Sequence, residues 1–317
     1  MNEQTLHVVL GAGPAGTATA AELASRDHRV RHVSRSPIPE GHKRIETMQA
    51  DVSTPQGAIV ATEGAAVIYH AVNVAYHLQV DALPGITEAI IAAAAHHDAR
   101  LVVLDTLYPY GTADGEAITE QTPWAATSRK GLMRAALDER YLEAHRTGEA
   151  RTVLGRAADF FGPGVFNATF GGAFFPGAIT GEPALAIGDI TLPHSYTYIK
   201  DVAAGLVALG TDDQGDGKVW HLPTNPAVPT ADLHRVVESI TGRDLAIDLV
   251  TEPVPYGPFD KQFMDEFAEM FYQYRIPQNM VSTAFESTFD VRPTPMRQAL
   301  EATLAWYEAV LAGSQTD

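Results

Sequence analysis

The 317-residue sequence contains no cysteine, and this absence removes several kinds of chemistry at once. Disulfide bonds, thiolate metal ligands and thiol nucleophiles all require a cysteine side chain. The 12 histidines show no His-Glu-x-x-His or similar ligand spacing, so we expect no metal site. Any reaction at this chain therefore depends on the remaining polar side chains or on a bound organic cofactor.

Basic residues are scarce, because 22 Lys and Arg stand against 39 Asp and Glu, which gives a net charge of −17. A protein that binds nucleic acid needs a basic face, and attraction to an anionic membrane also needs basic residues. We therefore expect neither nucleic acid nor a membrane as a partner. The excess negative charge favours solubility through self-repulsion.

Long hydrophobic runs are also missing. The longest apolar run, Ala89–Ala95, is far shorter than the roughly 20 residues of a membrane-spanning helix. The N-terminus shows no charged-then-apolar signal pattern. With 45% hydrophobic and 19% charged residues, the composition is that of a globular protein. We expect a cytoplasmic protein whose length is sufficient for two lobes.

The most informative segment present is a G-x-G-x-x-G turn, which follows an apolar strand expected over residues 8–10 and opens an alanine-rich helix. Gly11 permits the tight turn, Gly13 lets the backbone approach a pyrophosphate, and Gly16 lets the helix pack close to the strand. The helix start, with its free N–H groups and positive dipole end, suits a phosphate anion. The motif therefore predicts a dinucleotide site. Its expected contacts are Gly11, Gly13, Pro14, Ala15 and Gly16.

Strand and helix patterns alternate through the first half of the chain. We expect strands over 29–34, 66–72, 100–104 and 151–154, with helices over 85–97 and 130–145. This order predicts an α/β fold, a doubly wound parallel sheet of the Rossmann type.

Composition changes past Phe160, where turn-forming and Gly- and Phe-rich sequence begins. We expect residues 1–165 to form the NAD(P)-binding Rossmann domain, to which a segment around 195–225 returns. Residues 166–317 are expected to form a smaller C-terminal substrate-binding lobe, which covers the carboxyl ends of the strands, where such sheets bind ligands.

Four further segments share their order and spacing with one enzyme family. They are Asp-Thr-Leu-Tyr-Pro-Tyr-Gly at 105–111, Glu-Gln-Thr-Pro at 120–123, Phe-Gly-Pro at 161–163 preceded by Arg156, and Tyr-Ile-Lys-Asp-Val-Ala at 198–203. Together with the glycine motif, they resemble the extended short-chain dehydrogenase/reductase group, in its nucleotide-sugar epimerase/dehydratase branch. The resemblance implies a nicotinamide cofactor and chemistry at a carbonyl or alcohol.

The resemblance also implies roles for single positions. Asp51, in Gln-Ala-Asp-Val, matches the acid that meets the adenine after the third strand. Thr106 matches the Ser or Thr that polarises the substrate oxygen, although a threonine at a strand end is commonly a turn residue. Ala71, near the end of the strand expected over 66–72, is also expected to contact the cofactor.

The chain departs from the family pattern at the start of the catalytic helix. Family members carry Tyr-Gly-x-x-Lys there. The Tyr exchanges a proton at the substrate oxygen, while the Lys holds the nicotinamide ribose and lowers the pKa of the Tyr. Counted from Pro123, the two positions hold Lys130 and Arg134. The chain thus resembles an atypical member that keeps the cofactor fold and alters the catalytic pair.

Two interpretations of this pair are open. In the first, both side chains are solvated charges on the helix surface. In the second, both face the cofactor, and the neighbouring cation makes Lys130 an acid or base poised near neutral pH. Arg134 keeps its charge and can bind a ribose or phosphate. We expect Arg134 to contact the cofactor, Thr106 to orient the substrate oxygen, and Tyr108 or Lys130 to handle the proton.

Ser34 and Arg35 follow the second expected strand, where members that prefer NAD place an acid on the ribose 2′-hydroxyl. An arginine at this place can bind a 2′-phosphate instead. This favours NADP(H) over NAD(H), and the alternative for Arg35 is an exposed loop arginine without a ligand.

The tail is rich in Met and aromatic residues at helical spacing. Such a stripe indicates core packing or a subunit contact more often than a lid over a substrate. The stripe consists of Phe263, Met264, Phe267, Met270, Phe271, Tyr272 and Tyr274.

The sequence thus predicts an NAD(P)-dependent oxidoreductase of the epimerase/dehydratase type, acting on a small carbonyl, alcohol or sugar-like substrate. The alternative is a non-catalytic NADP(H)-binding sensor, which the altered catalytic pair motivates. A homodimer is expected only by analogy with the family.

Overall fold

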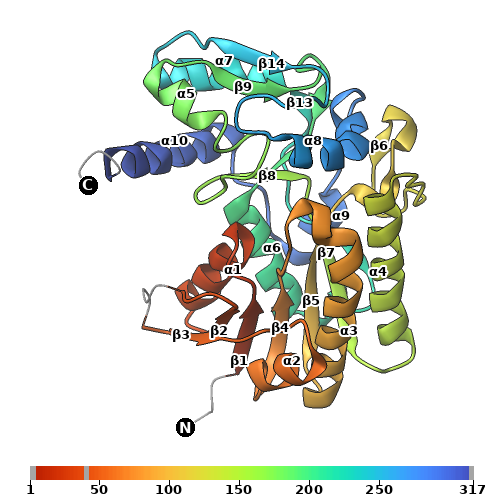
Figure 1. Cartoon of the computed structure of the whole chain (residues 1–317). Coiled ribbons are helices and arrows are strands. Elements are labelled where there is room, and N and C mark those ends of the chain that lie inside the picture. The colour runs from red at the N-terminus through yellow and green to blue at the C-terminus, as the bar shows by residue number, and fades with distance from the viewer. Residues whose placement is uncertain (1–4, 39–42, 314–317) are drawn as a thin grey trace.

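The computed structural model describes residues 5–38 and 43–313 of the chain. Its centre is a seven-stranded parallel sheet in the order β12-β7-β5-β4-β1-β2-β3, as Figure 1 shows. This arrangement confirms the predicted doubly wound α/β fold. The strands are β1 (Leu6–Leu10), β2 (Arg29–Ser34), β3 (Ile45–Gln49), β4 (Ala65–His70), β5 (Arg100–Asp105), β7 (Arg151–Arg156) and β12 (Val219–His221).

Both faces of the sheet are covered by helices, which is why its central strands are almost continuously apolar. Alternate residues of one strand enter different cores: Val9 packs on one side of the sheet, while Val8 and Leu10 pack on the other. The first core includes α1 (Pro14–Ser25) and α6 (Ile199–Thr211), and the second includes α2 (Pro55–Ala61), α3 (Gln79–His97) and α4 (Arg129–Arg146).

Helix α3 begins six residues earlier than the expected helix over 85–97. The pair Pro84-Gly85 favours a helix boundary in isolation, but the helix continues through both residues because its apolar face is buried on the sheet. The stretch Tyr76–His97 is also long and apolar enough to cross a membrane. Length and composition do not separate a membrane helix from a core helix, and α3 packs against α2 and α4 as a core helix does.

The remaining elements lie mostly beyond the carboxyl ends of the strands and form the upper part of the molecule in Figure 1. Strands β9 and β14 pair in parallel and are flanked by α5 and α7, and α10 packs on both of those helices. The bounds are α5 (Phe175–Thr180), β9 (Ala184–Ile187), α7 (Thr230–Thr241), β14 (Ile247–Val250), α8 (Lys261–Phe267), α9 (Thr283–Phe289) and α10 (Met296–Gly313).

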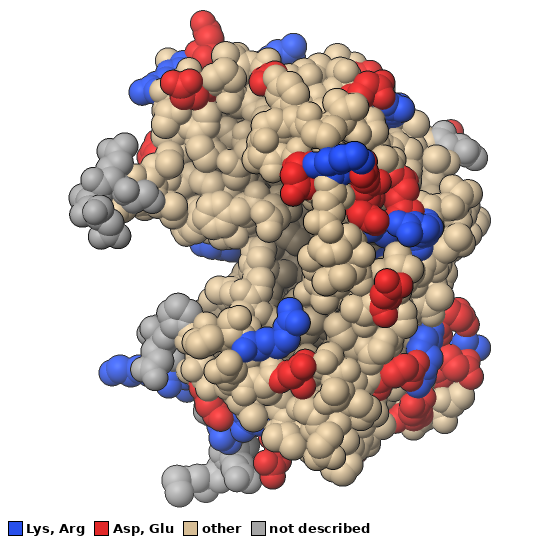
Figure 2. All heavy atoms as spheres, in the orientation of Figure 1, with Lys and Arg blue, Asp and Glu red and all other residues tan. Residues whose placement is uncertain are grey.

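Short strand pairs join the two parts of the molecule. Strand β8 pairs in parallel with β11, and the chain then passes through α6 to β12 of the central sheet. Figure 2 shows a deep notch between the two parts, at the side where the strands end. The short strands are β6 (Ala117–Ile118), β8 (Asp159–Phe161), β10 (Pro193–His194), β11 (Tyr196–Tyr198), β13 (Val228–Pro229) and β15 (Asn279–Met280).

Candidate functional site

The glycine turn lies between β1 and α1. Gly11 has φ +105°, and a Cβ there would stand 2.6 Å from the carbonyl oxygen of Ala71. At Gly16 a Cβ would stand only 1.9 Å from the carbonyl oxygen of Gly11. At Gly13 a Cβ would meet no atom within 4 Å. Two of the glycines are therefore required by the packing of the chain itself, whereas the third faces open space.

Helix α1 begins at Pro14, directly after Gly13, and no side chain caps its N-terminus. Its first N–H groups and its positive dipole end thus face the open space beside Gly13. The residues present fit a nucleotide pyrophosphate, because an anion there would find donors already aligned. Ala71 lies beside this turn, where its N–H donates to the carbonyl of Leu10 at 2.9 Å.

The end of β2 lies on the other side of the turn. The N–H of Ser36 donates to Ser34 Oγ at 3.2 Å, and Gln49 donates to the carbonyl of Arg35 at 2.8 Å. The Arg35 side chain is exposed. Hydrogen bonds from Ser53 hold the pKa of Asp51 below its usual value, and the guanidinium of Arg35 adds a smaller effect in the same direction. Ser34, Arg35 and Asp51 therefore border one region of the surface.

Arg134 lies on α4, facing the loop after β4. Its Nη2 donates to Asn73 Oδ1 at 3.5 Å, while its Nε is buried and has no hydrogen-bond partner among the described residues. A buried guanidinium N–H normally has an acceptor. The unsatisfied donor is thus compatible with a ligand oxygen at this point, and the assignment of Arg134 to the ribose remains a prediction.

Tyr108 follows Thr106 at the carboxyl end of β5, and its N–H donates to Thr106 Oγ1 at 3.4 Å. Its hydroxyl lies 3.3 Å from that of Tyr76. The pKa of Tyr108 is raised above its usual value, chiefly by burial and also by the negative charge of Asp159, although the hydrogen bond with Tyr76 and the charge of Arg134 act in the opposite direction. Tyr108 is therefore a neutral hydroxyl at neutral pH, close to the side of α4 that carries Arg134.

Lys130 fits neither interpretation that the sequence suggested. Its side chain is 0% exposed, so it is not a solvated helix charge. Its Nζ pairs with Glu266 Oε2, with Glu269 Oε1 at 2.8 Å and with the carbonyl of Glu266 at 3.2 Å. An ammonium has three N–H donors, and these three acceptors use them all. Its immediate charged partners are carboxylates, not a cation that would poise it as an acid or base.

Sequence reasoning missed Glu266 and Glu269. Their spacing of three residues on a helix, inside an otherwise apolar stripe, is the signal that could have identified them, because such residues share one helical face. What the sequence alone does not indicate is that this face meets the start of α4, about 140 positions earlier in the chain.

The aromatic and Met stripe is core, as the sequence indicated. It forms α8 and the 3₁₀ segment η5 (Ala268–Tyr274), and most of its side chains are buried together. The same cluster includes Tyr76 and Tyr108, and the ring of Tyr76 lies 5.7 Å from that of Phe263 and 6.2 Å from that of Phe267. The stripe therefore packs against Tyr76 and Tyr108 and covers them.

A second charged cluster lies deeper, where β5, β7 and α4 meet. Arg156 is completely buried; its Nε donates to Asp105 Oδ2 at 2.7 Å and its Nη2 donates to Asp138. Its guanidinium also stacks over Tyr110 and Trp124, at 4.5 and 4.8 Å from the ring centroids. Burial, and then the negative charge of Asp105, raise the pKa of Asp138. Arg156 serves to hold these elements together.

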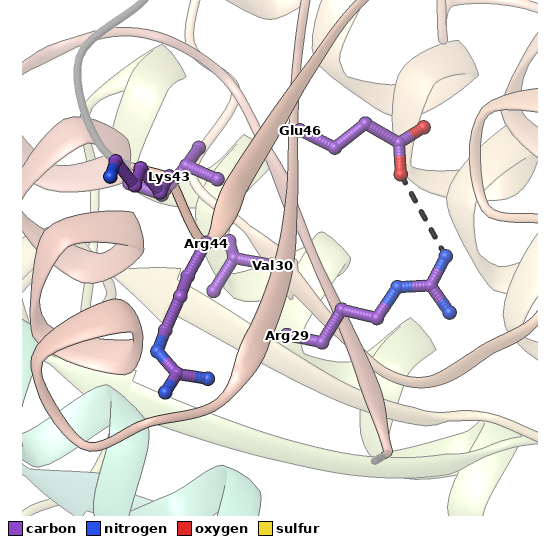
Figure 3. A pocket seen from close by; sticks show the side chains of 6 residues that line it. Arg29, Val30, Lys43, Arg44 and Glu46 are labelled. Atoms are coloured by element: carbon purple, nitrogen blue, oxygen red, sulfur yellow. Dashed lines mark ion pairs between the residues drawn. The ribbon is translucent and has the colours of Figure 1, made fainter. Parts of the chain in front are cut away.

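A surface hollow of about 300 Å³ lies elsewhere (Figure 3). It adjoins the first residues of β2 and β3, at the ends of the strands opposite to the glycine turn. Arg29 and Glu46, which line it, form an ion pair at 4.0 Å. Its position separates it from the candidate cofactor site. The hollow is lined by Arg29, Val30, Lys43, Arg44, Ile45 and Glu46.

Comparison with known sequences gives two matches. Residues 7–222 match the model of the NAD dependent epimerase/dehydratase family. A 2'-dehydrokanamycin reductase from Streptomyces kanamyceticus is 26% identical over 250 residues, which cover 76% of this chain and 68% of the relative.

Solved structures show the same fold at low sequence identity. A UDP-glucose 4-epimerase from Thermotoga maritima, solved with UDP-glucose, superposes with a TM-score of 0.80 at 14% identity, covering 97% of this chain and 100% of that one. A dTDP-glucose 4,6-dehydratase from Streptomyces venezuelae, solved with NAD and TYD bound, gives 0.79 at 16% identity, covering 96% and 97%.

Proposed function

Because the chain belongs to the NAD dependent epimerase/dehydratase family, we propose that it is an NAD(P)-dependent oxidoreductase that interconverts a carbonyl group and an alcohol on a small, sugar-like substrate. The observation that carries the proposal is the placement of Tyr108 beside Thr106 just after β5, with its hydroxyl 3.3 Å from that of Tyr76. The reductase from Streptomyces kanamyceticus supports the direction of carbonyl reduction.

The cofactor would rest on the α1 N-terminus, where Gly13 leaves open space, and Arg134 would bind the nicotinamide ribose. When bound, a reduced nicotinamide supplies a hydride to a carbonyl carbon. Arg35 stands where a 2′-phosphate would need a cation, and no acid precedes it at Ser34. We therefore propose NADP(H) as the preferred cofactor.

Within this scheme, Thr106 orients the substrate oxygen and Tyr108 gives it a proton. Reduction places negative charge on that oxygen, and the resulting alkoxide is a stronger base than a tyrosinate, so the proton moves from Tyr108 to the substrate. The hydroxyl of Tyr76, at 3.3 Å, can hydrogen-bond the tyrosinate that remains. Lys130 takes no part in the transfer, because its three donors are already used.

Oxidation of NADPH and of NADH, followed with a panel of aldehydes, ketones and oxo-sugars, tests the proposal. We expect turnover by the wild-type protein, with higher kcat/KM for NADPH. Tyr108→Phe is expected to lower kcat about 100-fold or more, the usual contribution of a general acid, while calorimetry shows unchanged NADPH affinity.

Tyr256→Phe is the matched control, because this tyrosine is half-exposed and hydrogen-bonds Asp248, away from the site. Full activity of Tyr108→Phe would contradict the assigned role. Tight NADPH binding by a wild-type protein that turns over no carbonyl would instead support the sensor, which the complete engagement of Lys130 favours.

A further inference from the structure

We propose that Lys130 is a positioning residue, which latches the stripe segment over Tyr108. The latch consists of Arg129, Lys130, Glu266 and Glu269, and the roof is the segment 261–274, made of α8 and η5. The catalytic part of this inference rests on the proposed reaction, whereas the structural part does not.

The start of α4 is bound to the roof at three consecutive residues. Ser128 Oγ contacts Met270 Sδ at 3.3 Å, and Arg129 Nη2 pairs with Glu266 Oε2 at 3.0 Å. Glu269 Oε2 accepts from the backbone N–H of Arg129 at 2.6 Å and from that of Lys130 at 3.4 Å. A carboxylate at a helix N-terminus is stabilised by the free N–H groups and by the helix dipole. The roof therefore supplies the anion that this helix end favours.

Lys130 makes the attachment costly to break. Its side chain is 0% exposed, whereas the side chains of Glu266 and Glu269 are 24% and 18% exposed. An ammonium removed from water is tolerated only with well-placed partners, and removal of one member leaves the other charge unpaired. Separation of the roof from α4 would leave Lys130 without its three acceptors. The pairing thus favours the closed arrangement.

The latch is connected to the proton donor through Tyr76. The Nζ of Lys130 lies 4.7 Å from the ring centroid of Tyr76, a cation–π contact. The other surroundings of that ring include Phe263 and Phe267 of the roof, and its hydroxyl meets that of Tyr108 at 3.3 Å. Displacement of the roof would therefore move Tyr76 and release the Tyr108 hydroxyl.

Two variants distinguish a positioning role of Lys130 from a role as general acid. Lys130→Met leaves two carboxylates facing an apolar side chain, so we expect faster hydrogen exchange in 261–274 and a kcat lowered on the order of 10- to 100-fold, the scale of a small misplacement. The neutral triple variant Lys130→Met/Glu266→Gln/Glu269→Gln keeps similar volumes and an amide oxygen at the α4 terminus. We expect it to restore both roof protection and kcat, because no buried charge is left unpaired. Arg129 also loses its two carboxylate partners, but its side chain is 66% exposed and stays hydrated.

Lys261→Met is the matched control, since it breaks an exposed pair with Asp265 on the same helix and should change neither readout. If Lys130→Met does not fold, Glu266→Gln serves in its place, with a smaller rise in exchange expected. The latch would be overturned if the single and triple variants lost kcat equally, hydrogen exchange in 261–274 stayed unchanged, and one limb of the pH–rate profile disappeared. Lys130 would then be an acid or base. If hydrogen exchange in 261–274 changes in the variants as expected, but the wild-type protein turns over no substrate, the latch is supported and the proposed reaction is rejected.

Discussion

Gly13 and Gly16 lie in one turn, but a side chain at each would meet very different surroundings. Gly13 has extended backbone (φ −71°, ψ 177°) and open space beyond its Cα. Valine there is unstrained within the chain but occupies the expected place of the pyrophosphate. We predict that Gly13→Val lowers NADPH affinity at least about 100-fold in calorimetry, the size of a lost phosphate subsite of about 3 kcal/mol, with an unchanged melting temperature.

Gly16→Val serves as the contrasting variant, because its Cβ would lie 1.9 Å from the Gly11 carbonyl oxygen. It should lose stability as well as affinity. Unchanged cofactor binding by Gly13→Val would show that the dinucleotide lies elsewhere.

Within the candidate site, the local structure was predictable from the sequence wherever it depends on neighbouring residues, while the roles of the residues stay predictions. The glycine turn is recognised from the apolar strand before it and the helix after it. The start of α4 is found by counting residues beyond Pro123. The partners of Lys130 were not predictable, because they reach it from about 140 residues away. The burial and the ion pairs of the Lys130 Nζ atom depend on tertiary contacts, which the local sequence does not show.

At the scale of elements, the buried Arg156 joins β5, β7 and α4 through Asp105 and Asp138. Arg156→Met would leave two buried carboxylates close together without a cation. We predict a loss of about 3–5 kcal/mol in the free energy of unfolding, the usual cost of breaking a buried pair from one side. Urea denaturation measures it.

The control is Arg146→Met, which removes an exposed partner of Glu139 and Glu143 at the other end of α4 and should leave the urea midpoint unchanged. An equal, small effect of both substitutions would mean that the buried cluster does not hold the elements together.

The elements themselves were predicted with uneven success, and the reason is the range of the interactions that form them. Five strands of the central sheet, β1, β2, β4, β5 and β7, are short apolar runs rich in β-branched residues, and the local pattern predicted them. Strand β3 has no buried residue and was not predicted. The early start of α3 at Gln79 and the parallel pairing of β9 with β14 depend on burial against distant segments. The helix start expected at residue 85 was therefore six residues too late.

At the scale of the whole molecule, five buried histidines of the described residues make stability depend on pH. His32 is one of them, because burial lowers its pKa. Burial lowers the pKa of His7, His221 and His234 to about 4 and that of His70 to about 3. The unfolded chain binds protons at these groups near pH 6.5, while the folded protein does not. The stability they contribute is therefore present at neutral pH and is lost as the pH falls from about 6.5 to about 4, or to about 3 for His70.

We predict that the free energy of unfolding falls over this range by up to about 1.4 kcal/mol per pH unit for each such group. The net charge of −17 acts in the opposite direction, because acid relieves self-repulsion. Comparison of His221→Gln with the wild type isolates one group, and its urea midpoint should depend less on pH. The exposed His96→Gln should keep the wild-type slope, and an identical slope in His221→Gln would refute the assignment.

The path of the chain between the two parts of the molecule limits how the protein can be divided. After β7 the chain leaves the central sheet and forms β8, which later pairs with β11. It then returns through α6 to form β12 at the edge of the sheet, and leaves the sheet again after β12. A single cut after residue 165 would strip one edge of the sheet and uncover the face that α6 protects. The chain thus passes more than once between the two parts that border the notch. Neither part should therefore fold as an isolated fragment.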